Sequence, residues 1–306
     1  MSRTVNGEHL FGEMEKEMLG KQIRKVAEYC GIEVINCTPM INHFHITARV
    51  PKKQPVSDAE LLRRYALLHS GLSRWQTQAL EAIERMLAED GEDAADWRER
   101  QLAMMGDISP FMQLAKQRFS IWYNRTHQRY GTLWAERYKS VLLEPRSAAV
   151  LMSAIYTDLN PVRAALVIDP KEYRYCGYAQ AVAGDKRAQQ GLASLFPGKT
   201  WEEAQPEYRI LLFLRAAKPR SKGAVLPVEV AARVVAEGGK IPWGELLRCR
   251  ARYLTDGAVL GSKAFVAEQL AEYRKRTGRG QRTRVRELPE HGGLAIMRNL
   301  PLPVLG

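Results

Sequence analysis

The sequence has no run of apolar residues long enough to span a bilayer and no secretory leader, so we expect a protein without a membrane partner. Its four cysteines have no paired spacing, which argues against a disulfide framework and against a zinc site. Acidic residues are few relative to basic ones, 34 against 46, and the formal net charge is +12. This balance indicates a polyanionic partner, most often nucleic acid.

Two histidines lie close together in an alternating segment, residues 41–50. Side chains alternate between the two faces of a strand, so Phe44 and Ile46 would share an apolar face while His43 and His45 share the other. Neutral imidazoles at this spacing can bind one divalent ion and leave coordination positions open. The pattern alone also fits a half-exposed polar strand face that carries two histidines by coincidence.

A mostly apolar helix is predicted from Ser147, its cap, to Asn160, where Pro161 disfavours helical geometry. Tyr156 and Asn160 lie four residues apart and therefore share one face of this helix. A tyrosine hydroxyl can attack a phosphodiester, but a pKa of about 10 leaves only about one molecule in a thousand ionised at pH 7. A metal ion on the phosphate would compensate, and Asn160 could add an oxygen ligand. The alternatives are a core tyrosine and a capping asparagine.

The N-terminal half reads as mixed helix and strand. Helical spacing over residues 13–30 ends at Gly31, and residues 33–37 and 41–50 form an expected antiparallel pair of strands. A polar, charged helical insertion follows over about residues 57–106.

Cap signals place the next boundaries. Ser57 and Glu60 form a capping box at the start of the insertion. Ser109 is predicted to cap a second helix, with Pro110 at its first position, and residues 140–144 form a short strand.

The stretch of residues 129–139 interleaves basic and aromatic side chains, which can meet phosphates and unstacked bases. The alternative is that Trp134 and Tyr138 pack into the core under a solvated charged edge. The tentative DNA contacts in and before this stretch are Arg125, Arg129, Trp134, Arg137 and Lys139.

Three motifs occur in one order: Asn-His-Phe-His at residues 42–45, Gly-Thr-Leu-Trp at 131–134 with Arg-Tyr-Lys-Ser at 137–140, and Tyr-Thr-Asp-Leu-Asn-Pro-Val-Arg-Ala at 156–164. Together they resemble the REP-associated tyrosine transposases, members of the HUH class of single-tyrosine transposases. The resemblance covers roughly residues 3–183.

The resemblance implies that Tyr156 is the nucleophile and that His43, His45 and Asn160 bind a divalent metal, Mg²⁺ or Mn²⁺. It implies cleavage and rejoining of single-stranded DNA at REP-like hairpins through a 5′-phosphotyrosine intermediate, without a nucleotide cofactor. The protein would be a cytoplasmic, nucleoid-associated bacterial enzyme, as a monomer or a homodimer. Spacing alone would equally permit zinc.

The resemblance also implies an α+β fold with a ferredoxin-like antiparallel sheet in residues 1–183. Only Ser2, Arg3 and Thr4 resemble the end of its first strand, which we therefore expect to be largely missing. A start codon assigned too late, another segment that fills the gap, or an impaired copy would each account for this.

Residues 184–200 are predicted to be a polar linker, and residues 201–306 an all-α, basic accessory region that binds DNA. Helices are predicted over residues 207–217, 227–236, 243–254 and 262–273, the last two as a helix-turn-helix or a plain helical hairpin. The segment 274–286 has seven basic residues among thirteen and none acidic, which favours a polyanion-binding arm. These basic residues are Arg274, Lys275, Arg276, Arg279, Arg282, Arg284 and Arg286.

Two other functions compete with the transposase hypothesis. A two-histidine phosphoesterase could use His45 and Thr47, but it needs a second His-x-Thr element that no other histidine supplies. A domesticated or inactive transposase would only bind DNA hairpins. The complete set of site residues favours catalysis, whereas the missing first strand favours the binding-only alternative.

Overall fold

A computed structural model of the chain describes residues 1–69, 74–145, 147–216, 257–278, 283–288 and 294–298. The chain forms two compact units, each of which is described by itself. Unit 1 comprises Met1–Phe11, Ile35–Thr47 and Trp134–Gly306, and unit 2 comprises Gly12–Val34 and Ala48–Leu133. Helices and strands both occur, which confirms a mixed α and β class.

Unit 2 is helical, and its first helix has the predicted bounds. Helix α1 (Glu13–Cys30) begins where the Glu15 carboxylate accepts a hydrogen bond from the Gly12 N–H, and it ends at Gly31 with φ of 65°, a left-handed cap. Leu19, Ile23 and Val26 form its buried stripe.

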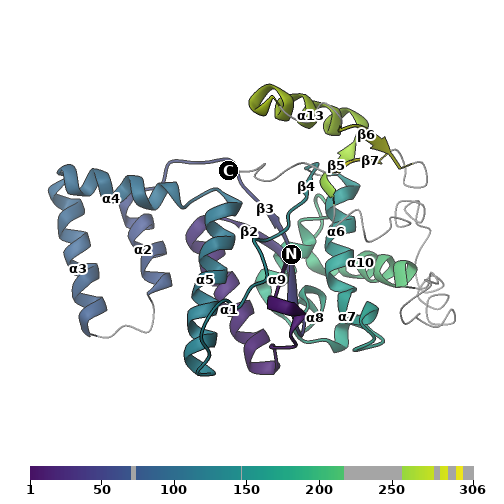
Figure 1. Cartoon of the computed structure of the whole chain (residues 1–306), viewed down its shortest axis with the longest axis horizontal. Coiled ribbons are helices and arrows are strands. Elements are labelled where there is room, and N and C mark those ends of the chain that lie inside the picture. Colours follow the sequence, from purple (N-terminus) through teal and green to yellow (C-terminus); the bar gives the residue numbers. More distant parts are fainter. Residues whose placement is uncertain (70–73, 146, 217–256, 279–282, 289–293, 299–306) are drawn as a thin grey trace. The chain divides into compact units, whose positions relative to one another are not determined.

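The helical insertion is present as α2 (Asp58–Leu68), α3 (Arg74–Glu89) and α4 (Glu92–Ala103) (Figure 1). Ser57 accepts a hydrogen bond from the Glu60 N–H, as a cap should. The Glu60 carboxylate does not complete the capping box, because it binds Arg63 and Arg64 instead.

Helix α5 (Ile108–Thr126) packs against α1 and begins earlier than predicted. Its cap is Asp107, whose carboxylate accepts from the Ser109 N–H at 2.7 Å, so the prediction of Ser109 as the cap is wrong. Both residues are good caps, but only Asp107 has the extended backbone that the position requires.

The first sheet has the strand order β1 (Ser2–Arg3), β3 (His43–Arg49), β2 (Glu33–Pro39). A turn of three residues joins β2 to β3, and the Met40 N–H donates to the His43 carbonyl, so these two strands are antiparallel as predicted.

Strand β1 is short, as expected, but its backbone is paired on both sides. It runs antiparallel to β3, with Ser2 opposite Phe44 and Arg3 opposite His43. On its other edge the Ala135 N–H donates to the Arg3 carbonyl, and the Lys139 N–H donates to the Met1 carbonyl. Residues 134–139 therefore pair with the edge of β1 that faces away from β3.

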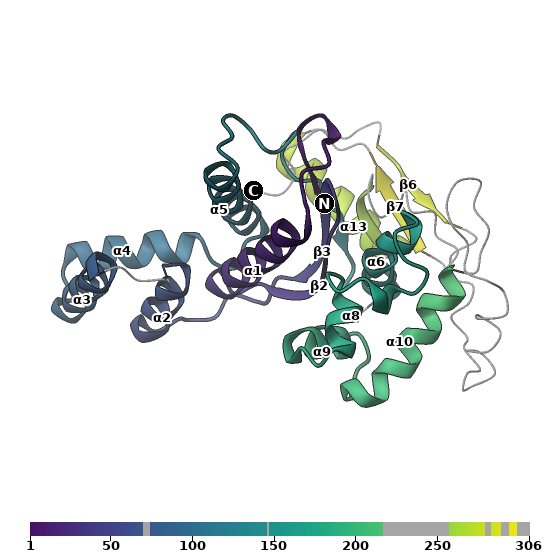
Figure 2. The same ribbon diagram turned by 90° about the horizontal axis from the view of Figure 1, so that it is seen from below.

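Over residues 147–216, unit 1 contains the helices α6 (Ala148–Asp158), α7 (Asn160–Arg163), α8 (Gly177–Val182), α9 (Lys186–Ala193) and α10 (Trp201–Ala216), with a 3₁₀ turn at Pro170–Glu172 (Figure 2). Ser147 accepts from the Ala149 N–H and caps α6, as predicted.

The prediction of a polar linker over residues 184–200 is wrong, because its central residues form α9. Asp185 caps this helix through the Ala188 N–H, and Leu192 is fully buried in the core. Gly191 lies against the backbone of β2, where an added Cβ atom would stand 2.3 Å from the Ile35 carbonyl oxygen. The segment is polar on one face only.

The prediction of an all-α C-terminal region is also wrong. A second sheet has the order β4 (Leu142–Leu143), β5 (Gly257–Ser262), β7 (Leu294–Arg298), β6 (Val285–Glu287). The predicted strand at residues 140–144 is therefore present but belongs to this sheet, where it runs parallel to β5.

Helix α13 (Lys263–Thr277) corresponds to the predicted helix 262–273 and packs on the second sheet through Val266 and Leu270. A strand, β5, directly precedes it, so the structure does not support a helix-turn-helix here. The predicted helices 227–236 and 243–254 lie outside the described residues.

The two sheets of unit 1 share one core. Leu260 of β5 and Ile296 of β7 are fully buried in the same hydrophobic cluster as Ile155 and Leu159. Because these last two residues flank Tyr156 along the chain, the C-terminal strands help to position the helix that carries the predicted nucleophile.

Candidate active site

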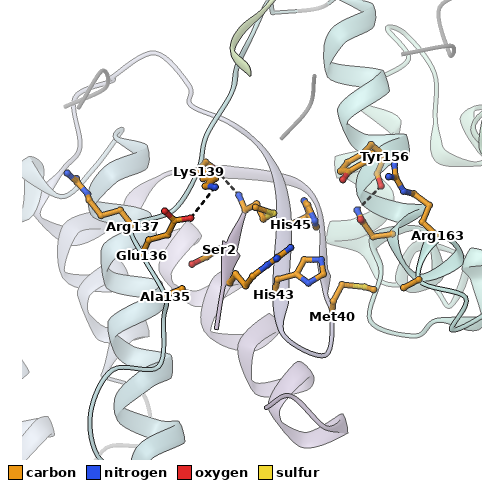
Figure 3. Close-up of a pocket in the computed structure, with 14 residues that line it drawn as sticks. Ser2, Met40, His43, His45, Ala135, Glu136, Arg137, Lys139, Tyr156 and Arg163 are labelled. Atoms are coloured by element: carbon orange, nitrogen blue, oxygen red, sulfur yellow. Dashed lines mark hydrogen bonds and ion pairs between the residues drawn. The ribbon is translucent and has the colours of Figure 1, made fainter. Parts of the chain in front are cut away.

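A pocket of about 510 Å³ in unit 1 contains the four residues that the resemblance assigns to catalysis and metal binding (Figure 3). His43 and His45 come from β3, Tyr156 from α6 and Asn160 from the start of α7. Arg137 and Lys139, predicted to contact DNA, line the same pocket.

The histidine face of β3 packs against α6. The Thr47 hydroxyl lies 3.2 Å from the hydroxyls of both Ser153 and Thr157, and His45 is 6% exposed. On this face His45 and Thr47 are buried, His43 is half-buried and Arg49 is exposed, so only part of it matches the half-exposed polar face of the plainer alternative. This packing places α6, which carries Tyr156, beside the histidines.

The rings meet at short range. The centroids of His43 and His45 are 5.1 Å apart, and those of His45 and Tyr156 are 5.4 Å apart, both edge to face.

Helix α6 is anchored by the Asn36 amide, which donates to the Ala154 carbonyl, and by the Tyr208 hydroxyl, which donates to Asp158. Asp158 is fully buried, and this burial raises its pKa to about 6.

Asn42 determines which nitrogen of His43 is free to bind a ligand. Its amide nitrogen donates to the Gly7 carbonyl at 2.9 Å, so its oxygen must be the atom that lies 2.7 Å from His43 Nδ1. Nδ1 then carries the proton, and Nε2 keeps its lone pair. Such a partner is typical of histidines that bind metals.

Hydrogen bonds also fix the orientation of the Asn160 side chain. Its amide nitrogen donates to the Tyr156 carbonyl at 2.8 Å and to the Thr157 carbonyl at 3.3 Å. Because carbonyls only accept hydrogen bonds, the nitrogen must face them, and the Asn160 oxygen points elsewhere. That oxygen is the atom that a hard cation would use.

Electrostatics keeps both histidines neutral. Burial, reinforced by the charge of Arg3, lowers the pKa of His43 to about 4. Burial also lowers the pKa of His45 well below its usual value. Neutral rings at physiological pH are the form that coordinates metal ions.

These donors fit a divalent cation: two neutral imidazoles and one amide oxygen on adjoining elements. In the described part of the chain, no three His, Cys, Asp or Glu side chains gather into a metal site. Oxygens of a bound phosphate and of water would therefore have to complete the coordination shell.

Two pocket arginines were not predicted. The Arg163 guanidinium lies over the Tyr156 ring, with its Cζ atom 4.5 Å from the centroid, and Arg3 is opposite His43 on β1. Arg163 could have been found from its position three residues after Asn160. Arg3 could not have been found from the sequence, because its position opposite His43 depends on the register between β1 and β3, which are far apart along the chain.

The other predicted DNA contacts are dispersed. Trp134 is buried against Phe11 and Phe44, with ring centroids 5.8 and 5.5 Å away, so its ring is not available for base stacking, contrary to the prediction. Arg125 and Arg129 belong to unit 2.

The basic C-terminal segment is described only in part. Lys275 and Arg276 are exposed near the end of α13, and Arg274 donates to the Thr283 carbonyl at 2.9 Å. Arg284 and Arg286 are exposed at β6. Arg279 and Arg282 lie outside the described residues.

Comparisons with protein-family models, curated proteins and solved structures find no match, so the functional argument rests on the residues and their geometry. Among the described helices, none is both long and apolar enough to cross a membrane.

Proposed function

We propose that this protein is a metal-dependent, single-tyrosine DNA strand transferase that cleaves and rejoins single-stranded DNA at hairpins. The observation that carries this proposal is the convergence of His43, His45, Tyr156 and Asn160, from three elements, on one basic pocket. A chance set of motifs would not be expected to meet in space.

In the proposed reaction, the Tyr156 hydroxyl attacks a DNA phosphorus atom and forms an oxygen–phosphorus bond while the bond from phosphorus to the 3′-oxygen breaks. The products are a 5′-phosphotyrosine and a free 3′-hydroxyl, and the proton lost by the phenol balances the proton gained by the 3′-oxygen. Reversal with another 3′-hydroxyl rejoins the strand.

His43 Nε2, His45 and the Asn160 oxygen would hold a magnesium or manganese ion. Such an ion, when bound, polarises the phosphate and stabilises the charge of the transition state. The residues themselves contribute preorganisation: Asn42 orients His43, and the Asn160 amide is held by the carbonyls of α6.

The proposal includes a ferredoxin-like arrangement of the first sheet. Supporting it are the order β1-β3-β2 and the backbone pairing of residues 134–139 along the free edge of β1. It also includes an accessory role in DNA binding for the exposed basic residues of α13 and β6.

The test uses a labelled single-stranded oligonucleotide that carries a palindrome from beside the gene, with and without Mg²⁺ or Mn²⁺. Wild-type protein should form an adduct that survives denaturing electrophoresis and requires the metal, and Tyr156→Phe should form none. The matched control is Tyr175→Phe, because Tyr175 is another buried tyrosine of unit 1 beneath an arginine, and it should keep full activity.

Two results would reject the proposal. An adduct that persists in Tyr156→Phe would show that another residue is the nucleophile. DNA that is shifted but never cleaved, equally by wild type and Tyr156→Phe, would instead establish a protein that only binds hairpins.

A further inference from the structure

Two arginines to which the resemblance assigned no role, Arg3 and Arg163, line the candidate site from different elements. Arg3 is directly opposite His43 in the antiparallel pair of β1 and β3, and residues directly opposite in such a pair project on the same face of the sheet. Both residues also line the same pocket.

Arg163 lies on the side of the pocket that Tyr156 lines. It ends α7, three residues after Asn160, and its guanidinium covers the Tyr156 ring. In Figure 3, His43 and His45 lie between the chain segment that carries Arg137 and the helices that carry Tyr156 and Arg163. Cations therefore border the histidines on more than one side.

The pocket has little negative charge of its own. Among the described residues that line it, Glu136 is the one carboxylate, and it pairs with Lys139 at 3.2 Å. Within the described residues, Arg3 has no carboxylate partner. A guanidinium that lies beside the two histidines and has no carboxylate partner suits an anionic ligand with several oxygens.

We propose that Arg3 and Arg163 form a phosphate clamp that binds the non-bridging oxygens of the phosphodiester under attack. This inference rests on the proposed function and adds two substrate-binding residues to it. The planar fork of a guanidinium matches two phosphate oxygens and complements the charge that grows on them as the tyrosine attacks.

The experiment compares Arg3→Gln and Arg163→Gln with a matched control, Arg174→Gln. Arg174 also stacks on a tyrosine, with its Cζ atom 4.8 Å from the Tyr175 ring centroid, but it does not line the pocket. Each variant loses one positive charge. Thermal melts of all proteins establish that each one folds.

Two quantities are measured for each protein: the single-turnover rate of adduct formation with saturating oligonucleotide, and the Kd for the same oligonucleotide without metal. We expect the rate to fall by about 100-fold or more in Arg3→Gln and in Arg163→Gln, as when one transition-state donor is removed. Both quantities should stay within about twofold of wild type in Arg174→Gln, because that charge contacts no substrate phosphate. Lysine at either pocket position should recover part of the rate, since it restores the charge without the fork.

Rates in both glutamine variants that equal the control, with Tyr156→Phe inactive, would overturn the clamp and leave the proposed function standing. Absence of an adduct in the wild type would overturn the proposed function. In that case the Kd values still test whether Arg3 and Arg163 bind phosphate. Kd values of Arg3→Gln and Arg163→Gln equal to that of Arg174→Gln would reject phosphate binding by these two arginines.

Discussion

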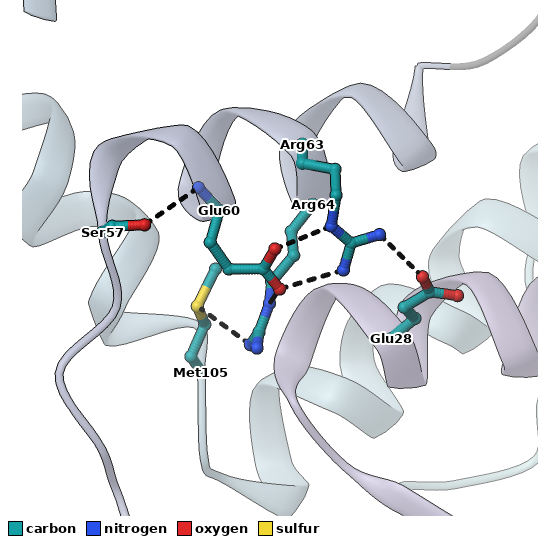
Figure 4. Close-up of polar contacts among 6 residues, drawn as sticks. All are labelled: Glu28, Ser57, Glu60, Arg63, Arg64 and Met105. Carbon is teal, nitrogen blue, oxygen red and sulfur yellow. Dashed lines mark hydrogen bonds and ion pairs between the residues drawn. The ribbon is translucent and has the colours of Figure 1, made fainter.

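The arginines of unit 2 and those of the unit 1 pocket are used in opposite ways. In unit 2, Arg63 donates to Glu60 and to Glu28, and Arg64 donates to the same Glu60 carboxylate (Figure 4). These donors and acceptors satisfy one another within the helical insertion and α1. In the pocket, Arg3 and Arg137 have no carboxylate partner among the described residues.

The difference teaches that a net charge of +12 does not identify a DNA-binding surface. Cations whose hydrogen-bond donors are satisfied by carboxylates stabilise the fold and present little field to a polyanion. Cations around a pocket with a single, paired carboxylate can still bind phosphate. In unit 2 the charged donors and acceptors pair with one another. In the pocket, by contrast, hydrogen bonds fix the orientations of the His43 ring and the Asn160 amide.

Among the variants that test this difference, the largest effect is expected from Asn42→Ala, which removes the acceptor that orients His43. We expect metal affinity to fall about 10- to 100-fold, because second-shell partners of ligating histidines have this effect when they are lost. Isothermal titration with Mn²⁺ measures it. The matched control is Asn124→Ala in unit 2, whose amide also donates to a backbone carbonyl and which should leave Mn²⁺ binding unchanged. Equal losses in both variants would show that Asn42 does not act through His43.

A smaller effect separates the two kinds of arginine. Arg137→Gln should weaken binding of a single-stranded oligonucleotide several-fold and reduce the slope of log K against log salt by about 0.7, because one phosphate contact is lost. Arg63→Gln should leave that slope unchanged and lower the stability of unit 2 by at most about 1 kcal/mol, as expected for a partly exposed ion pair. Fluorescence anisotropy over a salt series and urea denaturation measure the two quantities. The comparison fails if both variants change the salt slope equally.

The smallest effect is a pH dependence in unit 2. Hydrogen bonds from Arg63 and Arg64 lower the pKa of Glu60 from 4.5 to about 2. A carboxyl group with a lowered pKa in the folded state contributes stability above its unfolded pKa, and this contribution is lost as the pH falls through the folded pKa. Glu60→Gln should therefore be less stable than wild type at pH 7, and the difference should vanish near about pH 2.

Urea denaturation at several pH values checks this prediction. The matched control is Glu99→Gln, an exposed carboxylate of α4, which should show no such convergence. A constant difference between wild type and Glu60→Gln across the acidic range would contradict the pairing seen in Figure 4.

Features that depend on a few neighbouring residues could be predicted from the sequence. The bounds of α1, the Ser147 cap and the shared placement of His43 and His45 follow from helical spacing, cap chemistry and strand alternation. The same holds for Tyr156 and Asn160, because four residues make one turn of a helix. These short-range signals are sufficient to nominate the site residues.

Contacts between distant segments could be decided only by the tertiary structure. Arg3 reaches His43 through strand register, and Asn42 orients that ring because Gly7 holds its amide. Residues 184–200 were predicted to be a polar linker and the C-terminal segment to be all-α, yet Leu192 and Leu260 are buried in the core that holds α6. Such pairings depend on which surfaces meet after the chain has folded, and a sequence pattern read over ten residues carries no information about them.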